Sequence, residues 1–161
     1  MVFNMKFKLF SLIVIAIGLS SCSAQSGAYS NTINCLGVEM DGSQTLESWG
    51  SGRNRFDAVE QAKKNAINEV LFKGILNGKP ECERKPLVPE VNAREKYASY
   101  FNAFFADGGE YLNYITLQDE RFDDKIGRGR QKGSNSVSNR VIVRVMRPDL
   151  EQKLRKDGIL K

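Results

Sequence analysis

The sequence contains no histidine among its 161 residues. This absence excludes the Ser-His and Cys-His nucleophile systems and removes the commonest metal ligand. It also removes the side chain whose unperturbed pKa lies nearest to neutrality. No other nucleophile motif is present, so the sequence predicts a protein that is not an enzyme and that uses no cofactor.

The chain also lacks an apolar run long enough to span a membrane. Its longest run covers about eleven residues, Leu9 to Leu19, whereas a spanning helix needs ~20. Lys6 and Lys8 precede this run, and small residues follow it. This order is typical of a bacterial secretory signal with a basic, an apolar and a cleavage region. Residues 1–21 are therefore predicted to be a signal peptide.

The residues at the predicted cleavage point, Leu19-Ser20-Ser21-Cys22, resemble the lipobox of bacterial lipoproteins. The resemblance implies that Cys22 is acylated and becomes the mature N-terminus. A plain secretory signal with a chance cysteine is the alternative. Residues 22–32 are small and polar, which is typical of a flexible tether, and residues 33–161 form a single domain. Because no acidic residue follows Cys22 closely, the resemblance implies the periplasmic face of the outer membrane.

Cysteine is scarce, with three residues in the whole chain. Lipid on Cys22 would leave Cys35 and Cys82, an even pair in an oxidising compartment. A disulfide between them would close a loop of about 48 residues and stabilise the fold by ~3–4 kcal/mol. Two unpaired thiols, one of them buried in a strand, are the alternative.

Hydrophobic periodicity and turn residues predict seven elements after the tether. The expected strands are about 36–40, 44–49, 111–118 and 137–146, and the expected helices are about 55–76, 92–106 and 148–158. Asp41-Gly42 predicts the turn of a hairpin, and Gly50-Ser51-Gly52 is expected to break the second strand. The order β-β-α-α-β-β-α favours an α+β fold, with an antiparallel sheet of about four strands and helices packed on one face.

The helix expected over residues 55–76 carries the clearest pattern. Asn54 is a candidate N-cap with Asp57 three residues later, and Glu60 and Lys64 have the spacing of an ion pair. Small residues recur at every fourth position and would let the helix lie close to a sheet: Ala58, Ala62 and Ala66.

The helix expected over residues 92–106 carries an aromatic stripe instead: Tyr97, Tyr100, Phe101, Phe104 and Phe105. This spacing favours a role in the core over a role as an interaction face.

Trp49-Gly50-Ser51-Gly52, followed by Arg55 and the alanine ridge, resembles the small outer-membrane lipoproteins related to flagellar FlgP and to the N-terminal domain of flagellar FlgT. The strand Val141–Met146 and the short helix after it are also similar. The resemblance covers about residues 36–75 and 137–158, whereas the aromatic helix and the proline loop with Cys82 depart from it. It implies a structural or assembly part of an envelope machine and supplies no catalytic residue.

Charge is modest and unevenly spread. The net charge of +5 includes Lys6 and Lys8, whose removal leaves +3, which is too little to imply nucleic acid. One glycine-containing segment concentrates the basic residues: Lys125, Arg128, Arg130 and Lys132. Arginines grip phosphate or carboxylate with two hydrogen bonds. This segment is the candidate partner- or anion-binding site, and a solvated basic loop is the alternative.

Two groups of acidic residues are weaker candidates for acid–base or cation-binding sites. Glu39 and Asp41 share a strand face but lie at a hairpin tip, where solvated carboxylates are ordinary. The second group lacks the spacing of an EF-hand loop: Asp119, Glu120, Asp123 and Asp124. No metal site is predicted from either.

These observations favour a lipid-anchored structural or accessory component of a multiprotein envelope assembly, such as a secretion system, a motility ring or an export complex. The expected partners are outer-membrane lipid, through Cys22, and envelope proteins, with a homo-oligomer left open. The alternative is a lipoprotein that binds an anionic envelope polymer, peptidoglycan or lipopolysaccharide, through the basic segment around Arg128 and Arg130.

Overall fold

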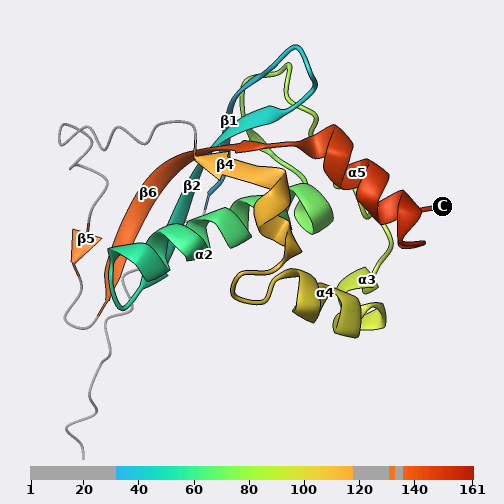
Figure 1. Ribbon diagram of the computed structural model, residues 1–161. Coiled ribbons are helices and arrows are strands. Elements are labelled where there is room, and N and C mark those ends of the chain that lie inside the picture. Colours follow the sequence, from blue (N-terminus) through green and yellow to red (C-terminus); the bar gives the residue numbers. More distant parts are fainter. Residues whose placement is uncertain (1–31, 118–130, 133–135) are drawn as a thin grey trace, which may run out of the picture.

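The computed structural model describes residues 32–117, the backbone of residues 131–132, and residues 136–161 (Figure 1). Its regular elements follow one another as β1 (Asn34–Val38), β2 (Gln44–Gly52), α2 (Arg55–Asn68), β3 (Asn77–Gly78), α3 (Ala93–Lys96), α4 (Ala98–Phe104), β4 (Ile115–Leu117), β5 (Gln131–Lys132), β6 (Val137–Val145) and α5 (Arg147–Lys156). A π-helical turn, Glu69–Lys73, continues α2, and a 3-10 turn, Glu110–Tyr114, precedes β4.

The strands form one sheet in the order β3-β1-β2-β6-β4, and β5 also pairs with β6. The predicted α+β class is therefore confirmed. The prediction of a purely antiparallel sheet is wrong in one detail, because β3 runs parallel to β1, with Asn77 beside Asn34 and Gly78 beside Cys35. Asn77 and Gly78 directly follow the helix expected over residues 55–76, and they extend the sheet at its edge.

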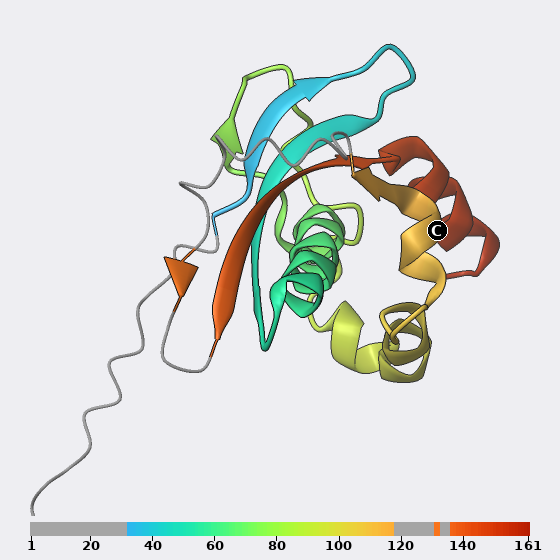
Figure 2. The same cartoon turned by 60° about the vertical axis from the view of Figure 1, so that its left-hand side comes forward.

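Helix α2 crosses the concave side of the sheet, and α3, α4 and α5 gather on the same side (Figure 2). The close approach that the alanine ridge predicts is present, since Ala58, Ala62 and Ala66 are completely buried. The Ser48 hydroxyl donates to the Ala62 carbonyl at 2.8 Å, and the Asn65 amide donates to the Trp49 carbonyl at 2.8 Å. These contacts join the middle of α2 directly to β2.

Strand β2 does not break at Gly50 as predicted but continues to Gly52, paired with β6 along its whole length. Gly50 and Gly52 lie beneath the first turns of α2. A Cβ atom at Gly50 would overlap the Ala58 carbonyl oxygen and the Ala62 nitrogen, and one at Gly52 would overlap Asp57. The two glycines therefore provide the floor on which α2 rests rather than a strand terminator.

Helix α2 begins where the sequence predicts but ends earlier. The N-cap is confirmed, because the Asp57 amide donates to the Asn54 side-chain oxygen at 3.0 Å. The helix ends at Asn68 instead of residue 76, and the π-helical turn leads to Gly74, whose φ is +80°. Glycine tolerates this left-handed backbone, so the chain can turn there toward β3.

The aromatic stripe belongs to the core, as its spacing favours. Phe101 and Phe104 are 1% and 3% exposed, and Phe72 meets Phe101 edge-to-face at 4.8 Å. The predicted single helix is interrupted at Tyr97, whose φ of −107° and ψ of 33° separate α3 from α4. The strand predicted over 111–118 is shortened to β4, because the 3-10 turn before it directs Tyr111 inward.

The predicted disulfide between Cys35 and Cys82 is present. Both cysteines are buried, and the bond joins the proline-containing loop to β1. The Lys79 amide also donates to the Cys35 carbonyl at 3.0 Å. At the C-terminal end of the loop, the Val88 amide donates to the Leu71 carbonyl at 2.8 Å. The loop is thus fixed at both ends.

The C-terminal part follows its prediction closely. Val141, Val143 and Val145 of β6 face the core, and α5 buries Leu150 and Leu154 completely. Its predicted start near Pro148 and stop near Gly158 agree with Arg147–Lys156.

Candidate functional site

The basic segment predicted as the binding site is described only in part. Lys125, Arg128 and Arg130 lie outside the described residues, as do Cys22 and the acidic residues 119–124. Lys132 is located through its backbone, in β5, where it pairs with Val137 of β6. The register therefore fixes one end of the basic segment against the first residue of β6.

The end of the sheet where Lys132 lies also carries the turn between β2 and α2. Val137 pairs with Gly52 on its other side, so Lys132, Val137 and Gly52 are neighbours across three strands. The β2–α2 turn, defined here as residues 52–56, exposes 93% of the Arg53 side chain and 73% of Phe56. This juxtaposition depends on strand register, which is why the linear sequence did not reveal it.

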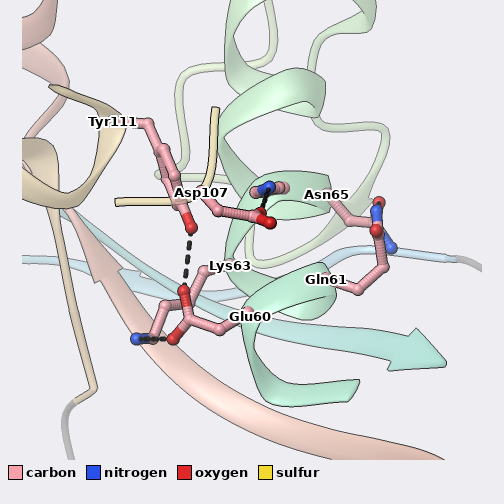
Figure 3. A network of polar contacts seen from close by, with 7 residues as sticks. Glu60, Gln61, Lys63, Asn65, Asp107 and Tyr111 are labelled. Carbon is pink, nitrogen blue, oxygen red and sulfur yellow. Dashed lines mark hydrogen bonds and ion pairs between the residues drawn. The ribbon is translucent and has the colours of Figure 1, made fainter. Parts of the chain in front are cut away.

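A polar network beside this turn was not anticipated from the sequence (Figure 3). The Tyr111 hydroxyl donates to one oxygen of Glu60 at 2.8 Å, and the Lys63 ammonium contacts the other at 2.6 Å. The predicted Glu60–Lys64 pair is wrong, because Lys64 reaches across to Asp107 at 2.7 Å and lies 5.5 Å from the centre of the Tyr111 ring. The network joins α2 to the segment before β4.

The electrostatics of this network keep Glu60 and Tyr111 in their ordinary charge states. Burial raises the pKa of Glu60, but hydrogen bonds from Lys63 and Tyr111 lower it by more, so the net shift is downward. Burial and the hydrogen bond to Glu60 raise the pKa of Tyr111 well above its ordinary value. Glu60 is therefore a carboxylate and Tyr111 a neutral donor at neutral pH, and neither is adjusted for proton transfer.

A half-open cleft of about 520 Å³ lies over the network. Its rim includes Arg53 and Phe56 of the β2–α2 turn, and Gly108 and Leu112 line the other side. Three carboxylates line the cleft, and each is paired with a basic side chain of the same cleft. The pairs are Glu60 with Lys63, Asp107 with Lys64, and Asp57 with Arg53 at 3.4 Å. Since these charges already satisfy one another, the cleft is a structural junction with an accessible rim rather than a preformed ion-binding pocket.

The opposite side of the sheet carries the alternate residues of β2 and β6. Arg140 pairs with Glu47 at 3.0 Å, and Trp49 lies opposite Arg140 in the register. Arg144 reaches Asp41 at 2.7 Å in the loop between β1 and β2. The face is thus crossed by ion pairs, with the sole tryptophan among them half-buried.

The loop between β1 and β2 contains the predicted turn but is longer than a two-residue hairpin. Val38 pairs with Gln44, so residues 39–43 form the loop, and Gly42 has the positive φ that the Asp-Gly pair suggested. Glu39 and Asp41 do not converge on a cation site. The Asp41 carboxylate accepts from the Ser43 hydroxyl at 2.6 Å and from Arg144.

The stability of the protein is expected to depend on Asp41 in acid. Hydrogen bonds from the Ser43 side chain and backbone, followed by Arg144, lower the pKa of Asp41 from 3.8 to about 2. A depressed folded-state pKa stabilises above the unfolded pKa and is lost as pH falls toward the folded one. Asp41→Asn should therefore lower the urea midpoint at pH 7, by an amount that shrinks between about pH 4 and pH 2. An equal difference at both ends of that range would contradict this assignment.

Among the described residues, no cluster of three or more acidic or cysteine side chains is arranged to hold a metal ion. Nor does any helix in the described ranges have the length and apolar character to cross a bilayer. No protein-family model matches the chain, and comparison with curated proteins and with solved structures finds no match either. The resemblance to the flagellar lipoproteins stays a prediction.

Proposed function

We propose that this protein is a lipid-anchored, non-enzymatic component of a multiprotein assembly in the bacterial envelope. The observation that carries the proposal is the use of the three cysteines. The Cys35–Cys82 disulfide accounts for two of them, and a buried disulfide is typical of an oxidising compartment. The third, Cys22, ends the lipobox-like sequence and is the one cysteine left for acylation.

The side-chain chemistry of the cleft supports a structural role rather than catalysis. Its carboxylates are each paired with a basic side chain, and Tyr111 is a neutral donor engaged with Glu60. The surfaces left for partners include the sheet face around Trp49 and Arg140, two residue types that are enriched at protein interfaces. An assembly component needs surfaces of this kind and no reactive group.

The second candidate function is binding of an anionic envelope polymer. It is favoured by the register that brings Lys132 beside the turn with Arg53. Basic residues from two distant parts of the chain then lie at one end of the sheet, where phosphates or carboxylates of lipopolysaccharide or peptidoglycan could approach. In this case the basic segment would contact the polymer instead of a protein.

The lipid anchor is tested by labelling cells with radioactive palmitate. We expect label on the wild-type protein and its recovery with membranes, and we expect loss of both in Cys22→Ser. Cys35→Ala in the same assay controls for the loss of a cysteine as such, and should keep the label. Unlabelled wild-type protein would contradict the lipoprotein assignment.

The assembly role is tested by crosslinking intact envelopes and recovering the tagged lipoprotein. We expect a fixed set of protein partners, and their loss in Arg128→Ala/Arg130→Ala if the contact lies on the basic segment. A matched control, Arg84→Ala/Lys85→Ala, removes two exposed basic side chains elsewhere. Recovery of lipid or cell-wall material alone would contradict the assembly role and support polymer binding.

A further inference from the structure

The dipeptide Asn77-Gly78 is the one place in the chain where an asparagine is followed by a glycine. Asparagine is among the chemically labile residues. A glycine after it has no side chain to shield its own amide nitrogen, so this nitrogen can reach the carbonyl carbon of the asparagine side chain. Attack there closes a five-membered succinimide ring. How readily the ring closes in a folded protein depends on how the two residues are held.

The fold presents this pair at an edge of the sheet. Asn77 and Gly78 form the whole of β3, and both residues are exposed. In the strand order of the described sheet, β3 is the last strand on its side, beside β1 (Figure 2). Nothing within the described residues hydrogen-bonds to the Asn77 side chain. The side-chain amide is therefore accessible to water and free to rotate.

The strand register directs the reacting nitrogen away from β1. Cys35 lies beside Gly78, and its carbonyl accepts from the Lys79 amide at 3.0 Å. In a parallel pair, a residue that bonds to the two residues flanking its neighbour leaves the amide of that neighbour unused. The Gly78 N–H therefore points to the open side of β3 and has no ladder hydrogen bond to break before it reacts. A two-residue edge strand also opens easily.

The same register requires glycine at position 78. The φ of Gly78 is +112°, and a Cβ atom there would lie 2.2 Å from the Cys35 carbonyl oxygen. No other residue fits this close approach without displacing β1. The fold thus keeps an unshielded amide nitrogen directly after Asn77.

Three Asp-Gly pairs among the described residues could close the same ring, but their carboxyl groups are held as carboxylates. Hydrogen bonds lower the pKa of each, and the first donors are Ser43 for Asp41, Lys64 for Asp107 and Tyr100 for Asp157. A carboxylate resists attack because its charge repels the incoming nitrogen, whereas the amide of Asn77 is neutral at every pH. The four sites of one molecule therefore differ in reactivity for a physical reason.

We propose that Asn77 is a site of spontaneous deamidation that converts it to isoaspartate and aspartate. The Gly78 nitrogen loses its proton and bonds to Asn77 Cγ, the Cγ–Nδ2 bond breaks, and Nδ2 leaves with that proton as ammonia. Water then opens the succinimide. Opening at the Cγ carbonyl gives aspartate, and opening at the main-chain carbonyl gives isoaspartate, in which the main chain runs through the side chain. Water is the sole co-reactant, and the reaction does not depend on the lipid anchor.

Isoaspartate would remove β3 from the sheet. It adds one carbon atom to the main chain before Gly78, so that Gly78 no longer fits against Cys35 and the Lys79 hydrogen bond is lost. Cys35 and Cys82 are 1% and 5% exposed in the intact fold, and a thiol reduces a disulfide only where it can reach a sulfur. Loss of β3 uncovers this bond, so the modified protein should be reduced faster.

The test incubates the purified full-length protein in mildly alkaline buffer, which favours loss of the amide proton. Isoaspartate is measured by enzymatic transfer of a radioactive methyl group to it and is located by mass spectrometry of peptides. We expect several-fold more label on the peptide with Asn77 than on any peptide with an Asp-Gly pair. Asn77→Gln should lose this label, because its ring would have six members and close slowly. The matched control Asn102→Gln removes an exposed asparagine that precedes alanine and should keep the label.

Label that is unchanged in Asn77→Gln would overturn the proposal, and so would equal label on the Asp-Gly peptides. The rate of reduction by dithiothreitol tests the loss of β3. Aged wild-type protein should be reduced several-fold faster than fresh protein. Fresh Asn77→Asp should behave like fresh wild type, because it has the new charge without the longer main chain. Label on Asn77 with equal reduction of aged and fresh protein would refute the loss of β3.

Discussion

Gly50→Ala is expected to destabilise the protein by about 3 kcal/mol, at the upper end of what overpacking costs. The added methyl group would overlap the Ala58 carbonyl and the Ala62 nitrogen, which are backbone atoms of one helix and cannot move apart singly. Helix α2 must then lift from the sheet, with loss of the Ser48 and Asn65 hydrogen bonds. Alanine would restrict the unfolded chain and so favour folding by up to about 1 kcal/mol, but the clash outweighs this.

The measurement is the free energy of unfolding from urea or guanidinium titration, and Gly37→Ala on strand β1 is the matched control. At Gly37 a new methyl group meets only the ends of the Lys79 and Glu81 side chains, at 3.8 and 3.9 Å. We expect that variant to stay within about 0.5 kcal/mol of wild type, as ordinary surface substitutions do. Similar losses for Gly50→Ala and Gly37→Ala would refute the close approach of α2 to β2.

Residues around α2 show how far the fold could be predicted from the sequence. The N-cap at Asn54 and the alanine ridge follow from local chemistry, and both were predicted correctly. The role of Gly50 was not predicted correctly, because the local sequence around a glycine that ends a strand does not differ from that around a glycine that lies under a helix. The difference is decided by the position of α2 above the strand, which is a tertiary property. The parallel pairing of Asn77 with Asn34 escaped prediction for the same reason.

The candidate site could be predicted less well than the fold. Lys64 was assigned to Glu60 by helical spacing, but Asp107, 43 residues away, is its partner. Tyr111 was expected in a strand, and its hydrogen bond to Glu60 depends on the 3-10 turn that replaces the start of that strand. Side chains that meet across such distances leave no periodic signal. The Cys35–Cys82 pair could be predicted because three cysteines with one assigned to lipid leave a single pairing.

Cys35→Ala/Cys82→Ala is expected to lower the free energy of unfolding by about 4 kcal/mol. The disulfide joins two residues that are 47 positions apart in the sequence, and so it removes much of the conformational entropy of the unfolded chain. The loss should also be local. β3 is only two residues long, and such a short edge strand has little stability of its own, so the loop from Lys79 to Cys82 would detach first. We expect faster amide exchange there than in β2 or β6.

Treatment of the wild-type protein with a reductant checks the same bond without mutation. It should shift the unfolding midpoint as far as the double alanine variant does, and should leave that variant unchanged. Cys22→Ala is the control for the removal of a cysteine, and we expect its domain stability to equal that of wild type, because Cys22 lies in the predicted tether, outside the described residues. If reduction shifted the double variant as well, a bond other than Cys35–Cys82 would be responsible. The double variant keeps Cys22 as its one cysteine, so that bond would have to join Cys22 to a thiol outside the chain. A Cys22 sulfur held in a disulfide cannot also carry lipid, so this result would contradict the membrane anchor too.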